Sequence, residues 1–84
     1  MTTGTTASGT YYLYNKKDQD VPIVFVHGVG LTHEIWQPQL EFFKYHSTLA
    51  YDILGHGKSL LEKEEITFDD FSDQLIGLMD HLNI

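Results

Sequence analysis

The sequence contains no cysteine, only two prolines, and five basic residues against twelve acidic ones. Without cysteine the chain has no disulfides, no thiolate nucleophile and no thiolate ligand for a metal ion. The formal net charge of −7 argues against nucleic acid or an anionic membrane as a partner, because binding to either needs a basic surface. We therefore expect no nucleic acid and no membrane partner.

The chain also lacks membrane-spanning and targeting segments. No stretch approaches the length of a membrane span. The N-terminus has neither the charged region nor the apolar region of a secretory signal. A cytoplasmic protein is the default expectation, and the 84 residues leave room for one small domain with a modest core.

The rest of the chain is organised around residues 23–30, which read Ile-Val-Phe-Val-His-Gly-Val-Gly. Four apolar residues without alternation predict a strand buried on both faces of a parallel sheet. The two glycines after His27 predict a turn that presents backbone N–H groups at the carboxyl edge of the sheet. Binding and catalytic groups collect at that edge in open α/β folds. An ordinary tight turn is an equally good interpretation of this stretch alone.

The N-terminal part of the chain is polar, and we expect regular structure there only in its last few residues. Residues 1–9 are mostly Thr, Gly, Ser and Ala, which predicts a flexible end or, at best, a weak first strand. Residues 10–14 are rich in Tyr and Thr and predict a regular strand.

A helix is predicted after the glycines. Residues 31–37 predict an irregular segment or a short helical turn, and Pro38 suits the first turn of a regular helix. Trp36, Leu40 and Phe43 fall on one helical face, which predicts that this helix packs against a sheet.

The C-terminal half predicts a second buried strand and a second helix. Residues 47–51 predict the strand, so that strand, helix and strand form a βαβ unit with a right-handed crossover. Thr67 predicts the N-cap of the final helix, with Asp69 and Asp70 near its positive end. Apolar residues then continue at helical spacing: Phe68, Phe71, Leu75, Leu78, Met79 and Leu82.

Two glycine-containing motifs, taken together, resemble the N-terminal part of an α/β-hydrolase. The first is H-G-x-G at residues 27–30, and the second is D-x-x-G-H-G-x-S at residues 52–59. The resemblance implies that residues 10–84 are the N-terminal portion of one α/β domain, a mostly parallel sheet with two helices in the order β-β-α-β-α. It also implies that the nucleophile, the catalytic acid and the catalytic histidine lie further along than this chain extends.

The resemblance implies a role for each motif. In the first motif the backbone N–H of Val29 is an oxyanion-hole donor, which stabilises the negative charge that acyl transfer places on a carbonyl oxygen. His27, Gly28 and Gly30 shape the turn. The second motif is a supporting loop, and the residues concerned are Asp52, Gly55, His56, Gly57 and Ser59.

These roles imply part of a hydrolase for a small-molecule ester or lactone, without a cofactor or a metal and not catalytically complete by itself. Residues 35–39 and the pair Tyr51-Asp52 most resemble enol-lactonases and small carboxylesterases. Epoxide hydrolases and dehalogenases share both motifs and differ in their nucleophile. A non-catalytic interaction fragment is the remaining interpretation.

Gly57-Lys58-Ser59 also permits two other functions. G-K-S after a strand occurs in the phosphate loop of P-loop NTPases, but that loop requires a glycine where this chain has Asp52, whose carboxylate would repel phosphate. The same stretch is close to the nucleophile elbow G-x-S-x-G, but Leu61 stands where a small residue is needed.

The histidines permit further readings. His56 is an alternative candidate for a proton shuttle. His33 begins H-E-x-x-H, but Gln37 occupies the second histidine position, and His33 also replaces the third glycine of G-x-G-x-x-G. His46 and His81 stand alone and predict surface positions. We therefore expect no metal and no dinucleotide.

The resemblance also predicts an exposed strand edge. In the family's sheet the strands of this chain run first, second, fourth, third, which leaves residues 23–26 at an edge. Such an edge pairs readily with other chains. We therefore expect self-association of the isolated chain or dependence on a partner.

Overall fold

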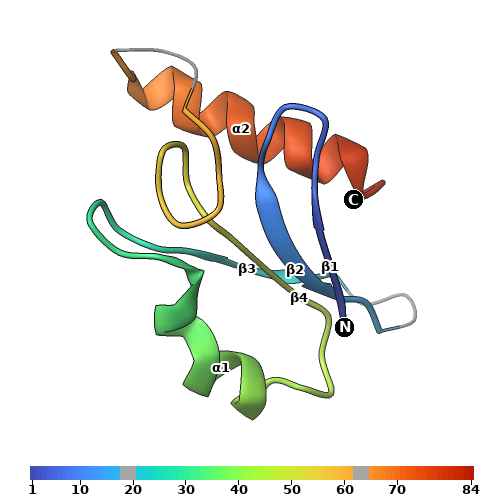
Figure 1. Ribbon diagram of the computed structural model, residues 1–84. Coiled ribbons are helices and arrows are strands. Elements are labelled where there is room, and N and C mark those ends of the chain that lie inside the picture. Colours follow the sequence, from blue (N-terminus) through green and yellow to red (C-terminus); the bar gives the residue numbers. More distant parts are fainter. Residues whose placement is uncertain (18–20, 62–64) are drawn as a thin grey trace.

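The computed structural model describes residues 1–17, 21–61 and 65–84. A four-stranded sheet lies between two helices, with α1 on one face and α2 on the other (Figure 1). The strands are β1 (Thr2–Thr5), β2 (Tyr11–Asn15), β3 (Ile23–Val26) and β4 (Thr48–Tyr51). They follow the order β1-β2-β4-β3, which confirms the predicted order and the edge position of β3.

The sheet is mostly antiparallel, so the expectation of a mostly parallel sheet is wrong. β1 pairs with β2 and β2 pairs with β4 in antiparallel fashion, and only β3 and β4 are parallel. Parallel pairing needs a long crossover connection, whereas β1 and β2 are joined by a short turn. Residues 1–9, expected as a flexible end or a weak strand, contain the first strand of this hairpin.

Burial differs sharply between the two parallel strands. All four residues of β4 are buried, as expected for residues 47–51. In β3, by contrast, Ile23 is 37% exposed and Val26 is 48% exposed. The prediction that β3 is buried on both faces is therefore wrong for these two residues, because the described sheet ends at this strand.

Both helices begin close to where the sequence predicts, at Pro38 for the first and at Thr67 for the second. The short helix η1 (His33–Trp36) leads into α1 (Gln37–Phe42), which has Pro38 in its first turn. Thr67 caps α2 (Phe68–His81), and its side chain exchanges hydrogen bonds with Asp70 in a capping box. With 14 residues, α2 is too short to cross a membrane, and no other helix in the described ranges is long and apolar enough either.

Alternate residues of β4 pack against the two helices on opposite faces of the sheet. Ala50 packs on the α1 side with Phe25 and Leu40, and Trp36 and Phe43 pack against this cluster as predicted. Successive strand residues point to opposite faces. The other face of β4 packs against α2 in a second cluster, whose buried members are Tyr12, Leu49, Tyr51, Ile53 and Leu78. Phe68 departs from the predicted helical face and is 90% exposed.

Candidate functional site

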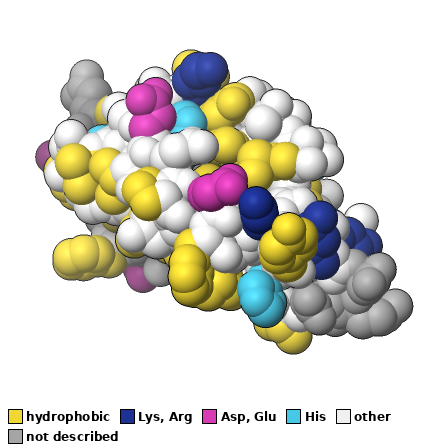
Figure 2. Space-filling model, turned by 90° about the horizontal axis from the view of Figure 1, so that it is seen from below, with side chains coloured by type: hydrophobic (Ala, Val, Ile, Leu, Met, Phe, Trp, Pro, Cys, Tyr) yellow, Lys and Arg dark blue, Asp and Glu magenta, His cyan; other side chains and the backbone are white. Residues whose placement is uncertain are grey.

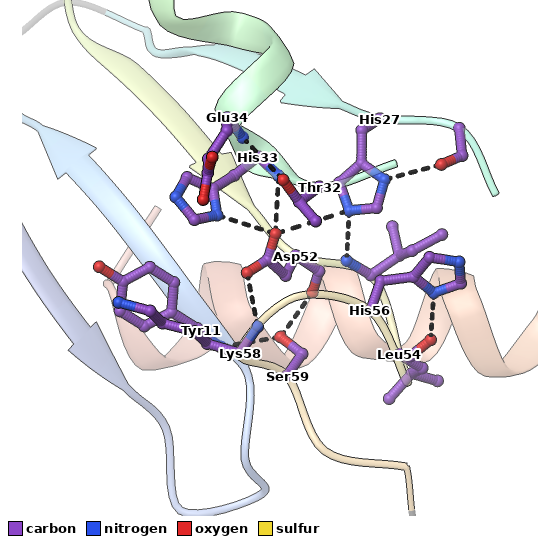
Figure 3. A network of polar contacts seen from close by, with 12 residues as sticks. Tyr11, His27, Thr32, His33, Glu34, Asp52, Leu54, His56, Lys58 and Ser59 are labelled. Atoms are coloured by element: carbon purple, nitrogen blue, oxygen red, sulfur yellow. Dashed lines mark hydrogen bonds and ion pairs between the residues drawn. The ribbon is translucent and has the colours of Figure 1, made fainter. Parts of the chain in front are cut away.

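The two motifs follow the carboxyl ends of β3 and β4 and meet there. Because these strands are parallel and paired from Ile23 with Thr48 to Val26 with Tyr51, the residues after them start at the same edge of the sheet. Residues 27–31 form a turn and residues 52–59 form a loop beside it (Figure 3). The described structure brings together all the residues that the resemblance assigns to a site.

The turn after β3 has the form of a type II turn. The Leu31 N–H donates to the Gly28 carbonyl at 3.1 Å, and Gly30, at the third position, has φ of +89°. A type II turn needs positive φ there, which explains the glycine. Val29 occupies the second position with its side chain 79% exposed. Within the described part of the chain, the Val29 N–H has no hydrogen-bond acceptor.

His27 is buried and uses both ring nitrogens. Nδ1 lies 2.8 Å from the Gly28 carbonyl oxygen, and Nε2 lies 3.0 Å from the Ile53 backbone nitrogen. Because Nε2 accepts from an N–H group, the proton of the neutral ring is on Nδ1. His27 therefore joins its own turn to the loop after β4 and has no nitrogen left for acid–base chemistry.

His56 makes the complementary connection from the loop to the turn. Nε2 accepts the Gly30 N–H at 2.9 Å, and Nδ1 donates to the Leu54 carbonyl at 2.9 Å. The centroids of the two rings, His27 and His56, are 5.6 Å apart. This geometry favours a supporting role for His56 over a proton shuttle, because both of its nitrogens are occupied by backbone groups.

The fully buried Asp52 carboxylate is the polar centre of the site (Figure 3). Oδ1 accepts the His33 backbone N–H at 2.7 Å and the His33 ring Nδ1–H at 2.8 Å, and Oδ2 accepts the Lys58 N–H at 2.9 Å. Burial alone would raise the pKa of Asp52. The hydrogen bonds from Lys58 and His33 outweigh burial and hold this pKa below its usual value.

The same carboxylate explains why the loop contains Gly57. This residue has φ of +51°, and a Cβ atom added there would lie 2.5 Å from the Asp52 carboxyl carbon. Gly55 also has positive φ, +73°, and lets the loop reverse. Both glycines are thus required by the path of the loop around a buried side chain.

Lys58 and Ser59 do not have the geometry of the two alternative motifs. The Lys58 N–H is bound by Asp52, and its Nζ lies 4.8 Å from the centroid of the Tyr11 ring. The buried Ser59 hydroxyl donates to the Asp52 carbonyl at 2.6 Å and accepts the Tyr11 N–H at 2.9 Å. A phosphate would have to displace the carboxylate, and the serine hydroxyl is not exposed as a nucleophile must be.

Two residues of the site had no assigned role from the sequence. His33 was noted only within incomplete motifs, yet it supplies two of the donors to Asp52. Gln74, buried on α2, accepts the Leu54 N–H at 3.0 Å and donates to the Asp52 carbonyl at 3.0 Å. These contacts join positions 19 to 22 residues apart, so no local sequence pattern predicts them.

An apolar pocket of about 250 Å³ adjoins the turn. It is lined by residues 26–29, by Tyr51 and Ile53, and by Phe68 and Phe71 of α2. In the described ranges, no three His, Cys, Asp or Glu side chains are placed to hold a metal ion. The site thus offers a backbone donor beside an apolar space.

Residues 23–83 match the model of the Alpha/beta hydrolase family. Over 72 residues the chain is 35% identical to (E)-2-((N-methylformamido)methylene)succinate hydrolase of Acinetobacter baylyi. It is 35% identical over 63 residues to 3-oxoadipate enol-lactonase 1 of the same organism, and 34% over 82 residues to Non-heme chloroperoxidase CPO-A1 of Kitasatospora aureofaciens. These alignments cover 84%, 74% and 95% of this chain but 27%, 23% and 30% of the relatives.

The fold is similar to a solved structure over nearly its whole length. A hydrolase from Pseudomonas aeruginosa PA01 superposes with a TM-score of 0.82 at 22% identity, covering 99% of this chain and 32% of that one. The chain therefore spans about a third or less of the length of the proteins it is similar to. The family model, the relatives and the shared fold agree that this chain belongs to the alpha/beta hydrolase family.

Proposed function

We propose that this chain supplies the oxyanion-hole turn of an ester or lactone hydrolase, with the Val29 N–H as the donor. The observation that carries this proposal is the N–H itself, which has no acceptor in the described part of the chain, whereas the N–H groups of Gly30 and Leu31 that follow it are bound. It lies at the carboxyl end of a strand, where ligands bind in α/β folds, and beside an apolar pocket.

The chemistry follows from what acyl transfer requires. Attack on an ester or lactone carbonyl places negative charge on its oxygen, and one preorganised N–H stabilises that charge in the transition state by about 3–4 kcal/mol. The lactone part of this substrate class comes from one of the relatives, which is named as an enol-lactonase. Ser59, the serine nearest to an elbow motif, is buried and hydrogen-bonded, so the nucleophile belongs to residues other than this loop.

A chimera tests this function in the setting of a complete hydrolase domain. In it, residues 1–84 replace the matching N-terminal part of 3-oxoadipate enol-lactonase 1. The informative variant is Val29→Pro, because proline suits the second position of a type II turn and removes the N–H. Val29→Ala is the matched control, since it shortens the same side chain and keeps the N–H.

We further propose that the free edge of β3 is an association surface. The Ile23 N–H donates to the Ser47 carbonyl at 2.8 Å, so the backbone groups of Ile23 and Phe25 face β4. Those of Val24 and Val26 point the other way, because successive residues of a strand alternate. An open row of donors and acceptors beside exposed Val26 and Phe68 favours pairing with a second copy of the chain.

Apolar surface on the α1 face of the molecule adds to this tendency. Seen from below, the face on which α1 lies carries several groups of hydrophobic side chains (Figure 2). Phe42 at the end of α1 and Tyr45 beyond it are both largely exposed. Exposed apolar patches of this kind promote association.

A further inference from the structure

The N–H of Val29 and the carbonyl of Gly28 belong to the same peptide plane, and His27 forms a hydrogen bond with that carbonyl. This plane contains the Gly28 carbonyl, which accepts the His27 Nδ1–H at 2.8 Å. The peptide bonds of residues 21–61 are all trans, so the N–H and the carbonyl of one plane point in opposite directions. By fixing the carbonyl of Gly28, His27 fixes the direction in which the Val29 N–H points.

The next peptide plane, between Val29 and Gly30, is held by His56. Its N–H donates to His56 Nε2 at 2.9 Å. Type I and type II turns differ by rotation of this central peptide, and glycine at the third position permits either form. The bond to His56 therefore favours the type II form over the flipped one.

Each of the two histidines accepts a hydrogen bond from the segment that carries the other one. His27 comes from the turn and accepts the Ile53 N–H of the loop, whereas His56 comes from the loop and accepts the Gly30 N–H of the turn. Each ring is anchored a second time through its Nδ1–H, to Gly28 and to Leu54 respectively. Both peptide planes that meet at Val29 are thus oriented by imidazoles in the same tautomer.

We propose that His56 is a positioning residue for the oxyanion turn, acting with His27 as a reciprocal pair that fixes the peptide planes on both sides of Val29. Its importance for catalysis rests on the proposed function of Val29, but the pair itself is observable without turnover. The arrangement requires the Nδ1–H tautomer of both rings. A proton on Nε2 of His56 would place two N–H donors against each other.

Other titratable groups lie close to the two histidines, and a pH experiment has to distinguish their protonation from that of His56. His56 faces the ring of His27. Nε2 of His27 lies 3.8 Å from Asp52 Oδ1, which is also bound by His33. The ring signals of all three histidines must therefore be followed individually while the pH is lowered.

The first measurement uses the unmodified chain labelled with ¹⁵N. We expect ring ¹⁵N shifts typical of the Nδ1–H tautomer for His56, and a scalar coupling across the hydrogen bond from the Gly30 amide nitrogen to His56 Nε2. The same coupling should join Ile53 to His27, and the Gly30 coupling should vanish in step with protonation of the His56 ring. An Nε2–H or averaged tautomer of His56 without the coupling would overturn the proposal.

The second measurement compares variants by amide hydrogen exchange. His56→Leu removes the acceptor, His56→Gln keeps an acceptor oxygen, and His46→Leu makes the same change at an exposed histidine. We expect Gly30 exchange to rise about tenfold in His56→Leu, the scale of one lost hydrogen bond, and much less in His56→Gln. Unchanged Gly30 exchange in His56→Leu, or an equal rise in His46→Leu, would contradict the positioning role.

If His56→Leu does not fold, the scalar coupling between Gly30 and His56 in the unmodified chain tests the positioning role by itself. The two proposals can also fail separately. An intact coupling combined with no effect of Val29→Pro in the chimera would retain the histidine pair and reject the oxyanion donor.

Discussion

The Asp52 carboxylate holds His33 twice, through the backbone N–H at 2.7 Å and through the ring Nδ1–H at 2.8 Å. The first bond fixes the backbone at the start of η1, and the second covers the buried charge with an imidazole. With Lys58 bound to the other oxygen, one side chain ties together the segments that follow β3 and β4. The site is thus organised around a buried anion whose partners are mostly backbone N–H groups.

This arrangement predicts a stability that depends on the charge of Asp52. Its pKa is lowered in the folded state, so the contribution is complete above the unfolded value of about 3.9 and is lost as the pH falls through the lower folded value. At pH 7, Asp52→Asn should reduce the free energy of unfolding by about 1–3 kcal/mol, because the amide nitrogen meets N–H donors. Urea unfolding between pH 7 and pH 2 measures both effects.

The matched control for this variant is Asp73→Asn, at an exposed position on α2. It should change the free energy of unfolding little at any pH. Equal losses in the two variants at pH 7 would show that the buried carboxylate contributes nothing specific.

Gly57 and Gly77 form a second matched pair. Gly57→Ala places a Cβ against the Asp52 carboxylate at positive φ and should cost about 2–4 kcal/mol. Gly77 lies inside α2, where an added Cβ would meet no atom within 4 Å apart from its own helical backbone and its chain neighbours, so Gly77→Ala should stabilise the chain by about 0.5–1 kcal/mol. Urea midpoints that move in the same direction for both variants would contradict the described loop geometry.

Much of this fold follows from local patterns in the sequence. The bounds of β3, the proline at the start of α1 and the cap at Thr67 were predicted because each depends on neighbouring residues. The sequence did not predict β1 firmly, because its Thr and Gly residues have no apolar period. They form a strand by pairing with β2. The antiparallel majority of the sheet was missed for the same reason.

The site was predicted through its two motifs but not through its internal contacts. The motifs made Val29, Asp52 and the glycines candidates, because the family resemblance is carried by short stretches of sequence. The bonds of Asp52 to His33 and of Gln74 to Leu54 connect segments that only the folded sheet brings together. Such pairings have no spacing rule that a single sequence displays.

The isolated chain should not hydrolyse esters. The proposed function gives it a single oxyanion donor, and the Ser59 hydroxyl is hydrogen-bonded to Asp52 and Tyr11 inside the loop. Release of p-nitrophenol from p-nitrophenyl acetate by the purified chain should equal that of buffer. Turnover that disappears in Ser59→Ala would revive Ser59 as a nucleophile.

The isolated chain should also associate through the edge of β3. Sedimentation velocity at micromolar concentrations should detect species larger than the 9.6 kDa monomer. Val26→Lys should shift the chain toward monomer, because a charge on an edge strand opposes pairing. Val21→Lys, at an exposed position outside the strand, should leave association unchanged. A monomeric chain with slowly exchanging Val24 and Val26 amides would show that this edge is already covered.

In the chimera with 3-oxoadipate enol-lactonase 1, the kcat values of the Val29 variants show whether the Val29 N–H stabilises the oxyanion. Loss of one oxyanion donor lowers kcat by about 10²–10³. We predict a loss of this size in Val29→Pro, a kcat in Val29→Ala within a few-fold of the parent chimera, and similar melting temperatures for all three proteins. Equal kcat values for the proline and alanine variants would contradict the assignment of the Val29 N–H as the oxyanion donor.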